Sequence, residues 1–332
     1  MKAAKLNSYS KKDLQLSIEQ IEKPTPNTQE VLVKVSAAGV NPLDNMITAG
    51  EVKLIVPYKL PITAGNEFVG VIENVGTDVT NYHVGDRVYA RMPLDKIGAF
   101  AEYLTIDQKE IARVPDYLSD EEAATVPLTA LTAYQTLNLL NVKAGKTIFI
   151  SGGTGSFGAM AIPIAKEFRL KVITNGGIDN KERVLALGAD QFIDYKTEDY
   201  TKVLTDVDYV IDTLGGEELI KQFSILKEGG ALVSLKGVPN RSFAKRMHLS
   251  AFKTFLFGMA GRKYDKLAAQ KNQTYDFIFV ESNGEQLSNI SKILEEKQIK
   301  PSVDKVFDFE EINLALDKVK NGHSSGKTII KF

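Results

Sequence analysis

The sequence predicts an α/β protein of two domains, in which a β-rich first third and a tail of similar character flank a doubly wound parallel sheet. Residues 30–106 carry short runs that alternate apolar and polar side chains, which is typical of half-buried strands. From residue 147 to 280, continuous apolar runs alternate with helical patterns, which is typical of a parallel sheet covered on both faces. The chain has 332 residues, 43% of them hydrophobic, which is enough for two cores.

The first third is expected to form a compact barrel or sandwich. Its predicted strands cover residues 30–40, 68–76, 86–90 and 99–106. The pattern then changes at Ser119, which stands three residues before Glu122 in the spacing of a helix capping box. A helix should begin there, and Pro127 is predicted to end or bend it.

The middle of the chain alternates strands and helices. The predicted strands cover 147–151, 171–174, 208–212, 231–235 and 276–280. Pro163 is expected inside the first of the intervening helices, with a local kink. The tail, 310–332, predicts one more helix and a closing strand.

Composition excludes several classes of function. The 41 basic and 42 acidic residues nearly cancel, whereas a dedicated nucleic-acid-binding protein normally shows a basic excess. There is no cysteine, so a disulfide framework, a thiolate nucleophile and a Cys-ligated zinc are excluded. His83, His248 and His323 are too far apart in sequence for a local metal motif.

No targeting or membrane-spanning segment is predicted. The first ten residues, MKAAKLNSYS, lack the apolar core of a signal peptide, and no run approaches the roughly 20 apolar residues of a membrane span. We therefore expect a cytoplasmic protein.

A glycine-rich loop is the strongest functional signal. Residues 153–158 read GTGSFG and follow an apolar strand, open a helix and precede a second strand, which is the context of a dinucleotide-binding loop. Gly153 would permit the sharp turn, Gly155 a close approach of the backbone to a pyrophosphate, and Gly158 the packing of helix on strand. The helix N-terminus would offer free N–H groups to the phosphates. The predicted loop residues are Gly152, Gly153, Gly155, Ser156, Phe157 and Gly158. The alternative is a glycine-rich turn that binds nothing.

The end of the second strand favours NADPH over NADH. An NAD site usually has an acidic residue there to hold the ribose hydroxyls, but this strand ends in Thr-Asn-Gly-Gly at 174–177. Small residues such as Asn175 and Gly176 leave room for a 2′-phosphate, to which Lys181, Arg183 and Tyr195 could supply charge and a hydroxyl. An ordinary solvated helix face is the alternative for the two basic residues.

Several motifs in a specific order resemble the medium-chain dehydrogenase/reductase superfamily, most closely its zinc-free quinone oxidoreductase branch with the zeta-crystallin-like and plant enone or alkenal reductases. The resemblance covers nearly the whole chain and rests on AAGVNPLDNMITAG (37–50), LPITAGNEFVGVIENVG (60–76), GDRV, GAFAEY, AATVPLTALTAYQTL (123–137), GGTGSFG, LGADQFIDY (187–195) and GHSSGKTIIKF (322–332). It implies a GroES-like β-barrel catalytic domain, residues 1–122 and 282–332, around a Rossmann NADP-binding domain, residues 123–281.

The resemblance also implies that no zinc binds. Zinc-dependent relatives carry a Cys where this chain has Asn41 and a His where it has Asn66. The neighbouring Glu67 is then expected to be a hydrogen-bonded structural carboxylate. Without a Lewis acid, the substrate must already be electrophilic, as a quinone or an α,β-unsaturated carbonyl compound is.

Further site residues follow from the same resemblance. Asn41 is expected near the nicotinamide and the substrate carbonyl, where its amide would hold a developing oxyanion; the alternative is a turn residue before Pro42. Tyr58 would stack on or protonate the substrate, or else be a core aromatic residue. Additional cofactor contacts are expected from Thr132, Leu214, Gly237 and Lys327. After hydride transfer, the proton is expected to come from water.

Residues 241–270 form an unusual segment, because seven Lys or Arg and one Asp are interleaved with Phe, Leu and Met. The favoured interpretation is a helical excursion packed beside the cleft, bounding a hydrophobic pocket. The alternative is a cationic amphipathic surface that makes peripheral contact with lipid. The resemblance implies that the strand at 276–280 pairs across a two-fold axis in a homodimer; the alternative is a covered edge strand in a monomer.

The sequence as a whole predicts a zinc-independent, NADPH-dependent oxidoreductase acting on a small hydrophobic quinone or enone. One-electron quinone reduction and hydride addition to an enone double bond remain open. An NADPH-binding protein with a regulatory or structural role and no turnover is the alternative from another class. Nucleic-acid binding would have to rest on the basic 241–270 segment alone.

Overall fold

The computed structural model describes residues 1–12, 14–322 and 325–332, so His323 lies outside the described residues. The chain divides into two compact units. Unit 1 joins Met1–Leu131 to Glu281–Phe332, and unit 2 is Thr132–Val280. The sequence predicts these junctions at 122/123 and 281/282; in the structure the first one falls inside helix α3 (Pro127–Leu139).

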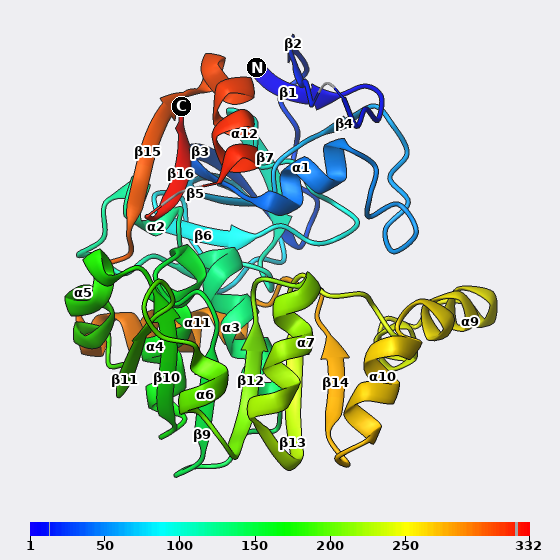
Figure 1. Cartoon of the computed structure of the whole chain (residues 1–332). Helices are drawn as coiled ribbons and strands as arrows, with labels where there is room; N and C mark the ends of the chain where they lie inside the picture. Colours follow the sequence, from blue (N-terminus) through cyan, green and yellow to red (C-terminus); the bar gives the residue numbers. More distant parts are fainter. Residues whose placement is uncertain (13, 323–324) are drawn as a thin grey trace. The chain divides into compact units, whose positions relative to one another are not determined.

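Unit 1 is built on a seven-stranded sheet that joins the two ends of the chain (Figure 1). The strand order is β15 (Val303–Asp308), β16 (Lys327–Lys331), β3 (Glu30–Val40), β5 (Glu67–Val75), β6 (Arg87–Arg91) and β8 (Ala112–Arg113), and β7 (Tyr103–Asp107) also pairs with β3. The closing strand β16 runs antiparallel to β3, from Thr328 opposite Val40 to Lys331 opposite Ala37. The predicted likeness between the tail and the first third is therefore confirmed by direct pairing.

The remaining elements of unit 1 are a small sheet and several helices. The sheet has the order β2 (Ser17–Gln20), β1 (Lys2–Leu6) and β4 (Ile62–Thr63). The helices are α1 (Pro42–Thr48), α2 (Asp120–Ala123), the start of α3, α11 (Gly284–Lys297) and α12 (Ile312–Asn321). Alternate residues of the large sheet, such as Val31, Val33, Phe68 and Ile72, are buried in one apolar cluster.

Two predicted boundaries in unit 1 are wrong. The strand predicted at 99–106 begins only at Tyr103, because Phe100 N donates to Ala64 O at 2.8 Å and Phe100 O accepts from Ala4 N at 2.8 Å. That stretch is therefore bonded beside the small sheet. Pro127 ends no helix. It begins α3, where a proline costs no hydrogen bond. The capping box is confirmed, since the Ser119 hydroxyl accepts from Glu122 N at 3.2 Å.

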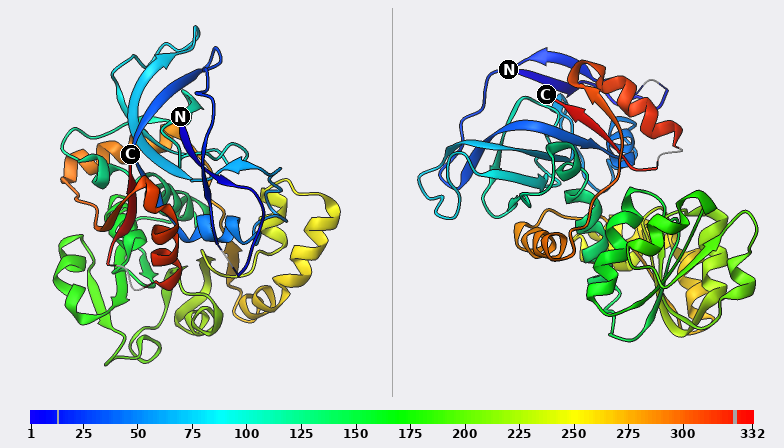
Figure 2. Two further views of the ribbon diagram at one scale, coloured as in Figure 1. Left: turned by 90° about the horizontal axis from the view of Figure 1, so that it is seen from above. Right: turned by 90° about the vertical axis from the view of Figure 1, so that its left-hand side faces the viewer.

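Unit 2 is a parallel six-stranded sheet with helices on both faces (Figure 2). The strand order is β11 (Gln191–Asp194), β10 (Lys171–Gly176), β9 (Thr147–Ile150), β12 (Val207–Asp212), β13 (Leu226–Ser234) and β14 (Thr274–Phe277). The order reverses between β9 and β12, the switch point at which such sheets bind ligands. The predicted Rossmann sheet is confirmed.

Helices link and cover these strands. They are α4 (Ser156–Glu167), α5 (Lys181–Ala186), α6 (Tyr200–Val203), α7 (Gly216–Ile225), α8 (Arg241–Arg246), α9 (Ala251–Ala260) and α10 (Arg262–Ala269). Residues of α6, α7 and α10 share one buried apolar cluster with the sheet. Pro163 lies inside α4, as predicted.

The last strand of unit 2 differs from its prediction. We expected it at 276–280, but β14 is Thr274–Phe277. Its partner β13 ends at Ser234, which lies opposite Phe277, so no further strand residue is available for pairing beyond that point. β14 is the edge strand of this sheet.

Candidate functional site

The glycine loop connects β9 to α4 and is held by the end of β10. Asn175 Oδ1 accepts from Gly152 N at 2.8 Å, and its backbone oxygen accepts from Gly153 N at 3.1 Å. Gly152 has φ +68°, a left-handed conformation that favours glycine. The loop is therefore a fixed turn at the carboxyl end of the first strand.

The glycines of this loop are needed for different reasons. A Cβ on Gly153 would lie 2.1 Å from Thr174 Oγ1, and one on Gly158 would lie 2.3 Å from Gly153 O. Packing within the protein therefore explains both of these. Gly155 has an ordinary φ of −83°, and a Cβ there would find only Gly152 O, at 3.7 Å. Nothing in the described protein requires glycine at position 155.

The N-terminus of α4 is suited to an anion. No side chain caps this 12-residue helix at Gly155, and its first turn carries no acidic residue. Its first N–H groups and the positive end of its dipole thus face the loop without a side-chain partner. Helix N-termini of this kind bind phosphate groups.

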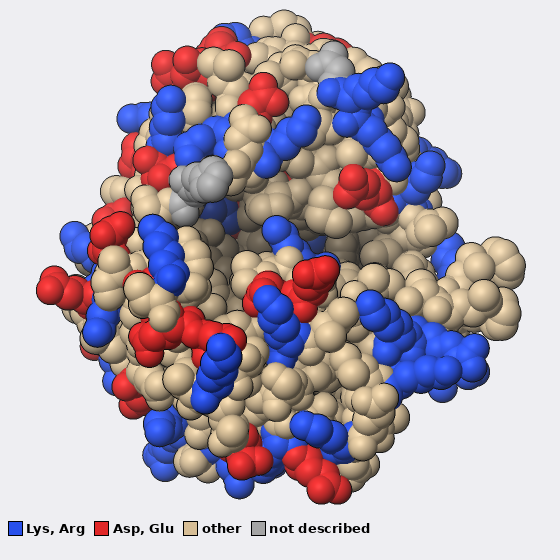
Figure 3. All heavy atoms as spheres, viewed as in Figure 1, with Lys and Arg blue, Asp and Glu red and all other residues tan. Residues whose placement is uncertain are grey.

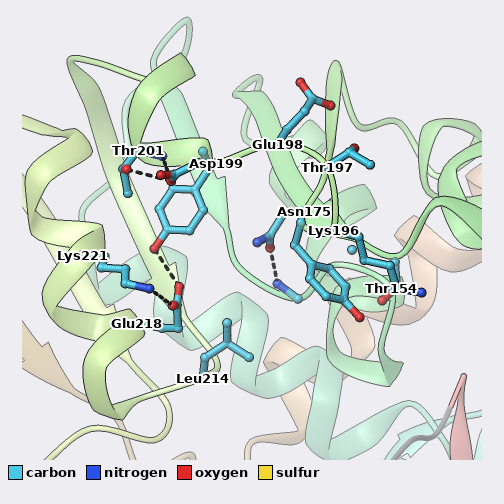
Figure 4. Close-up of a pocket in the computed structure, with 14 residues that line it drawn as sticks. Thr154, Asn175, Lys196, Thr197, Glu198, Asp199, Thr201, Leu214, Glu218 and Lys221 are labelled. Atoms are coloured by element: carbon cyan, nitrogen blue, oxygen red, sulfur yellow. Dashed lines mark hydrogen bonds and ion pairs between the residues drawn. The ribbon is translucent and has the colours of Figure 1, made fainter.

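A cavity of about 850 Å³ opens beside the loop (Figure 4). Its lining comes from the loop, from the end of β10 and from the segments that follow β11 and β12. The lining residues are Gly152, Thr154, Asn175, Gly176, Tyr195, Lys196, Thr197, Glu198, Asp199, Tyr200, Thr201, Leu214, Glu218 and Lys221. A cavity at the carboxyl ends of parallel strands is the usual place for a ligand in this type of sheet.

The cavity brings together five predicted cofactor residues: Gly152, Asn175, Gly176, Tyr195 and Leu214. Arg183 supports it from behind, since its guanidinium donates to Thr154 O at 2.6 Å. Lys181 is exposed at the start of α5, which agrees with the alternative that it belongs to a solvated helix face. Besides Lys181 and Arg183, the predicted cofactor residues outside the lining are Thr132, Gly153, Gly155, Ser156, Phe157, Gly158, Gly237 and Lys327. Their cofactor contacts stay predictions.

Sequence reasoning missed the part of the lining that follows β11 and the start of α7. Lys196 comes directly after Tyr195, so its place at the carboxyl end of a strand was the available signal. Glu218 and Lys221 pair at 2.6 Å, and Glu218 also accepts from the Tyr200 hydroxyl at 3.0 Å (Figure 4). The Lys221 ammonium therefore neutralises the negative charge that Glu218 brings to this side of the cavity.

A second candidate site lies in unit 1, at the start of α1. Lys327 Nζ lies 2.6 Å from Glu67 Oε1 and donates to Asn41 Oδ1 at 2.5 Å. The Lys327 and Glu67 side chains are 3% and 0% exposed, so this ion pair is fully buried. The other oxygen of Glu67 accepts from Leu128 N at 2.8 Å. The predicted structural role of Glu67 is confirmed.

The local fold positions Asn41 at the N-terminus of α1. Its extended backbone precedes Pro42, the first residue of the helix, so Asn41 is the N-cap residue of α1. Asn41 Nδ2 donates to Glu67 Oε1 at 2.8 Å and to Gly39 O at 3.3 Å. Both amide hydrogens are thus committed, and the predicted oxyanion role would need one of these bonds to be exchanged.

Tyr58 and Lys327 also have partners within unit 1. The Tyr58 hydroxyl donates to Leu94 O at 2.8 Å, and burial raises the pKa of Tyr58 to about 12, so the phenol stays protonated at neutral pH. The charge of Lys327 is balanced by Glu67. The catalytic role of Tyr58 and the cofactor contact of Lys327 stay predictions.

A buried carboxyl completes this cluster. Asp44 accepts from Asn66 Nδ2 at 2.7 Å and from Asn41 N at 2.7 Å. Burial raises the pKa of Asp44 to about 6, against the opposing effect of these two hydrogen bonds.

We expect Asp44 to make stability depend on pH. Its folded-state pKa lies above its ordinary value, so the folded chain holds the proton more tightly than the unfolded chain. The free energy of unfolding should therefore fall as pH rises from about 4 to about 6, by about 3 kcal/mol, and stay level above that. Chemical unfolding of the wild type and of Asp44→Asn at each pH isolates this effect, since all other carboxyls are common to both. Parallel curves for the two proteins would contradict it.

No group of His, Cys, Asp and Glu resembles a metal centre in the described ranges 1–12, 14–322 and 325–332. At the two positions where zinc-dependent relatives are expected to carry ligands, this chain has the amides of Asn41 and Asn66. Both amides are engaged by carboxylates. This donor set does not fit zinc.

A GroES-like unit joined to a Rossmann unit, whose glycine loop opens on a cavity, defines a dinucleotide-dependent dehydrogenase or reductase. Two family models match the chain: an alcohol dehydrogenase GroES-like domain over residues 27–116 and a zinc-binding dehydrogenase domain over residues 187–330.

Whole-chain relatives agree with these matches. The chain is 30% identical to the 2-methylene-furan-3-one reductase of Solanum lycopersicum, over 99% of this chain and 79% of the relative. It is also 30% identical to the mitochondrial NAD(P)H oxidoreductase RTN4IP1 of Homo sapiens, over 99% of this chain and 89% of the relative. The solved quinone oxidoreductase of Coxiella burnetii superposes with a TM-score of 0.83 at 29% identity, covering 100% of this chain and 99% of that one. The chain therefore belongs to the medium-chain dehydrogenase/reductase superfamily, among its quinone oxidoreductases and enone reductases, and takes a nicotinamide cofactor.

Proposed function

We propose that this protein is a zinc-independent, NADPH-dependent reductase of quinones or α,β-unsaturated carbonyl compounds. The observation that carries the proposal is the glycine at position 155. The surrounding protein leaves room for a Cβ there, and the backbone has an ordinary φ. A bound pyrophosphate supplies the missing reason, because it needs close approach of the backbone. The uncapped N-terminus of α4 supports the same assignment.

NADPH is the cofactor we favour over NADH. No acidic residue stands at Thr174–Gly177, the end of β10, where a carboxylate would hold the ribose hydroxyls of NADH and repel a 2′-phosphate. Tyr195 and Lys196 line the cavity just beyond β11 and would bind that phosphate. When bound, NADPH supplies the hydride.

The residues of the unit 1 cluster support chemistry without zinc. The Lys327 ammonium contacts both Glu67 Oε1 and Asn41 Oδ1, so the carboxylate is already neutralised by a cation of the protein itself. The substrate must then be electrophilic before it binds. An enone fits, since it accepts a hydride at the β carbon and a proton at the α carbon to give a saturated ketone. We propose that Asn41 and Tyr58 orient the carbonyl and that water supplies the proton.

The test is NADPH consumption with a short enone and with a quinone, each repeated with NADH and with identification of the products. Saturated ketone from the enone identifies an enone reductase; semiquinone, with the enone unchanged, identifies one-electron quinone reduction. We expect NADH to bind about ten- to a hundredfold more weakly, which is the effect of one charge-assisted contact. Lys196→Ala should lose most of that preference, whereas Lys202→Ala, an exposed neighbour, should retain it. Tight NADPH binding with no turnover of either substrate would favour the regulatory or structural alternative.

A homodimer remains part of the proposal. Support comes from β14, which is the edge strand of the unit 2 sheet and is short. An edge strand of this kind offers free backbone groups to a second copy.

A further inference from the structure

Helix α9 (Ala251–Ala260) exposes its large apolar side chains. Phe252 is 70% exposed, Phe255 63% and Met259 61%, and no residue of α9 is buried. The α9 side chains are therefore not packed in the interior of unit 2, whereas Phe243 of α8 is fully buried, and the expected role of this segment in bounding a substrate pocket stays a prediction. Burial of Phe243 against Phe257 anchors α9 and leaves the other aromatic rings outside.

Basic residues surround these apolar side chains. Of the seven Lys and Arg residues in 241–270, Arg246 pairs with Asp276 at 3.0 Å, and the other six form no ion pair with a described acidic residue. The single acid of the segment, Asp265, accepts from Asn240 Nδ2 at 2.8 Å. Figure 3 shows Lys and Arg gathered beside the tan tip of α9. We call this cationic, apolar surface of residues 241–270 the α9 surface.

A shallow groove of about 500 Å³ runs between α8, α9 and α10. Its lining includes the apolar Phe255, Gly258 and Met259, the basic Arg241 and Arg262, and one acidic residue, Asp265. Apolar groups flanked by two guanidinium groups match the chemistry of an amphiphile with an anionic head.

The charge decides between the two obvious occupants of the α9 surface. In a two-fold dimer built on this surface, the basic residues would need acidic partners on the second copy, and the same 241–270 segment offers one Asp against seven Lys or Arg. An anionic lipid surface offers opposite charge to the cations and an apolar layer to the Phe side chains. Among the described residues, no helix is long and apolar enough to cross a bilayer. With ten residues, α9 spans about 15 Å and would lie in the membrane interface.

We propose that the α9 surface docks this protein reversibly onto membranes of anionic phospholipid. Phe252, Phe255 and Met259 enter the interface between headgroups and acyl chains, and the surrounding Lys and Arg side chains bind lipid phosphates. The apolar and electrostatic contributions act together, so binding requires anionic lipid and weakens with salt.

The test is sedimentation of the full chain with vesicles of phosphatidylglycerol and phosphatidylcholine, against phosphatidylcholine alone, at low and high salt. We expect binding to the anionic vesicles at low salt only. Phe252→Ser with Phe255→Ser should lower the partition coefficient at least about tenfold, whereas Leu314→Ser, equally exposed on α12, should not. Arg262→Glu with Lys263→Glu should lower it at least about tenfold, whereas Lys202→Glu, with a side chain 81% exposed, should leave it unchanged. All six substituted positions are exposed, so the variants are expected to fold, and circular dichroism checks this.

Three results would overturn the proposal. The first is no sedimentation with anionic vesicles at low salt. The second is a dimer in light scattering that Phe252→Ser with Phe255→Ser converts to a monomer without changing vesicle binding, because a second copy would then cover the α9 surface. The third is salt-sensitive retention on heparin that needs Arg262 and Lys263 but not the two Phe residues, without vesicle binding, which would indicate nucleic acid.

Discussion

Replacing Lys327 with methionine is expected to lower the free energy of unfolding by about 3–5 kcal/mol, because it leaves the carboxylate of Glu67 buried without its cation. The pair is 2.6 Å apart, and its side chains are 3% and 0% exposed. Water therefore cannot take over from the lost ammonium. The measurement is chemical unfolding of the full chain. The signal should report on unit 1 and should not depend on nucleotide binding in unit 2.

A double-mutant cycle separates the ion pair from packing. Glu67→Gln alone should also destabilise, since it leaves the Lys327 ammonium uncompensated, but Lys327→Met with Glu67→Gln should recover a large part of the loss. Lys2→Met is the matched surface control. Lys2 pairs with Glu310 at 2.5 Å, but these side chains are 43% and 60% exposed, so its removal should change stability little. If Lys327→Met were as harmless as Lys2→Met, the buried pair would not hold this cluster together.

The fold was largely predictable because its signals are local. The capping box of Ser119 and Glu122 is a spacing of three residues, and the strand, glycine loop and helix at 147–167 are continuous in sequence. Strand ends were less predictable, because a strand stops where its partner stops. β14 ends opposite Ser234, and no feature of residues 276–280 themselves records that.

The candidate sites were predictable only in part, because their contacts join distant segments. Lys327 and Asn41 are 286 residues apart in sequence, so their hydrogen bond has no local signature. The motif resemblance identified both residues but placed Lys327 at the cofactor, since no pattern shows that Glu67 is its ion-pair partner. The solvent exposure of the α9 side chains could not be predicted from the sequence either. The Phe and Met residues of α9 fit a buried helix by composition, and only their surroundings show that they face solvent.

Alanine at position 155 separates a nucleotide cradle from a mere turn. We expect Gly155→Ala to fold with the stability of the wild type, because φ is −83° and the nearest protein atom to the new Cβ is Gly152 O at 3.7 Å. The affinity for NADPH should nevertheless fall at least about tenfold, since the methyl group stands where a pyrophosphate needs the bare backbone. Isothermal titration with NADPH and thermal unfolding without it measure the two effects independently.

Gly158→Ala is the contrasting variant. Its Cβ would lie 2.3–2.5 Å from the backbone of Gly153, which cannot rotate away, so overpacking should lower the stability by about 1–3 kcal/mol and distort the loop as well. Stability and affinity should therefore both fall in Gly158→Ala, whereas only the affinity should fall in Gly155→Ala. A Gly155→Ala protein that binds NADPH like the wild type would mean that no ligand approaches the loop there. Loss of affinity without loss of stability leaves the ligand as the one remaining reason for glycine at that position.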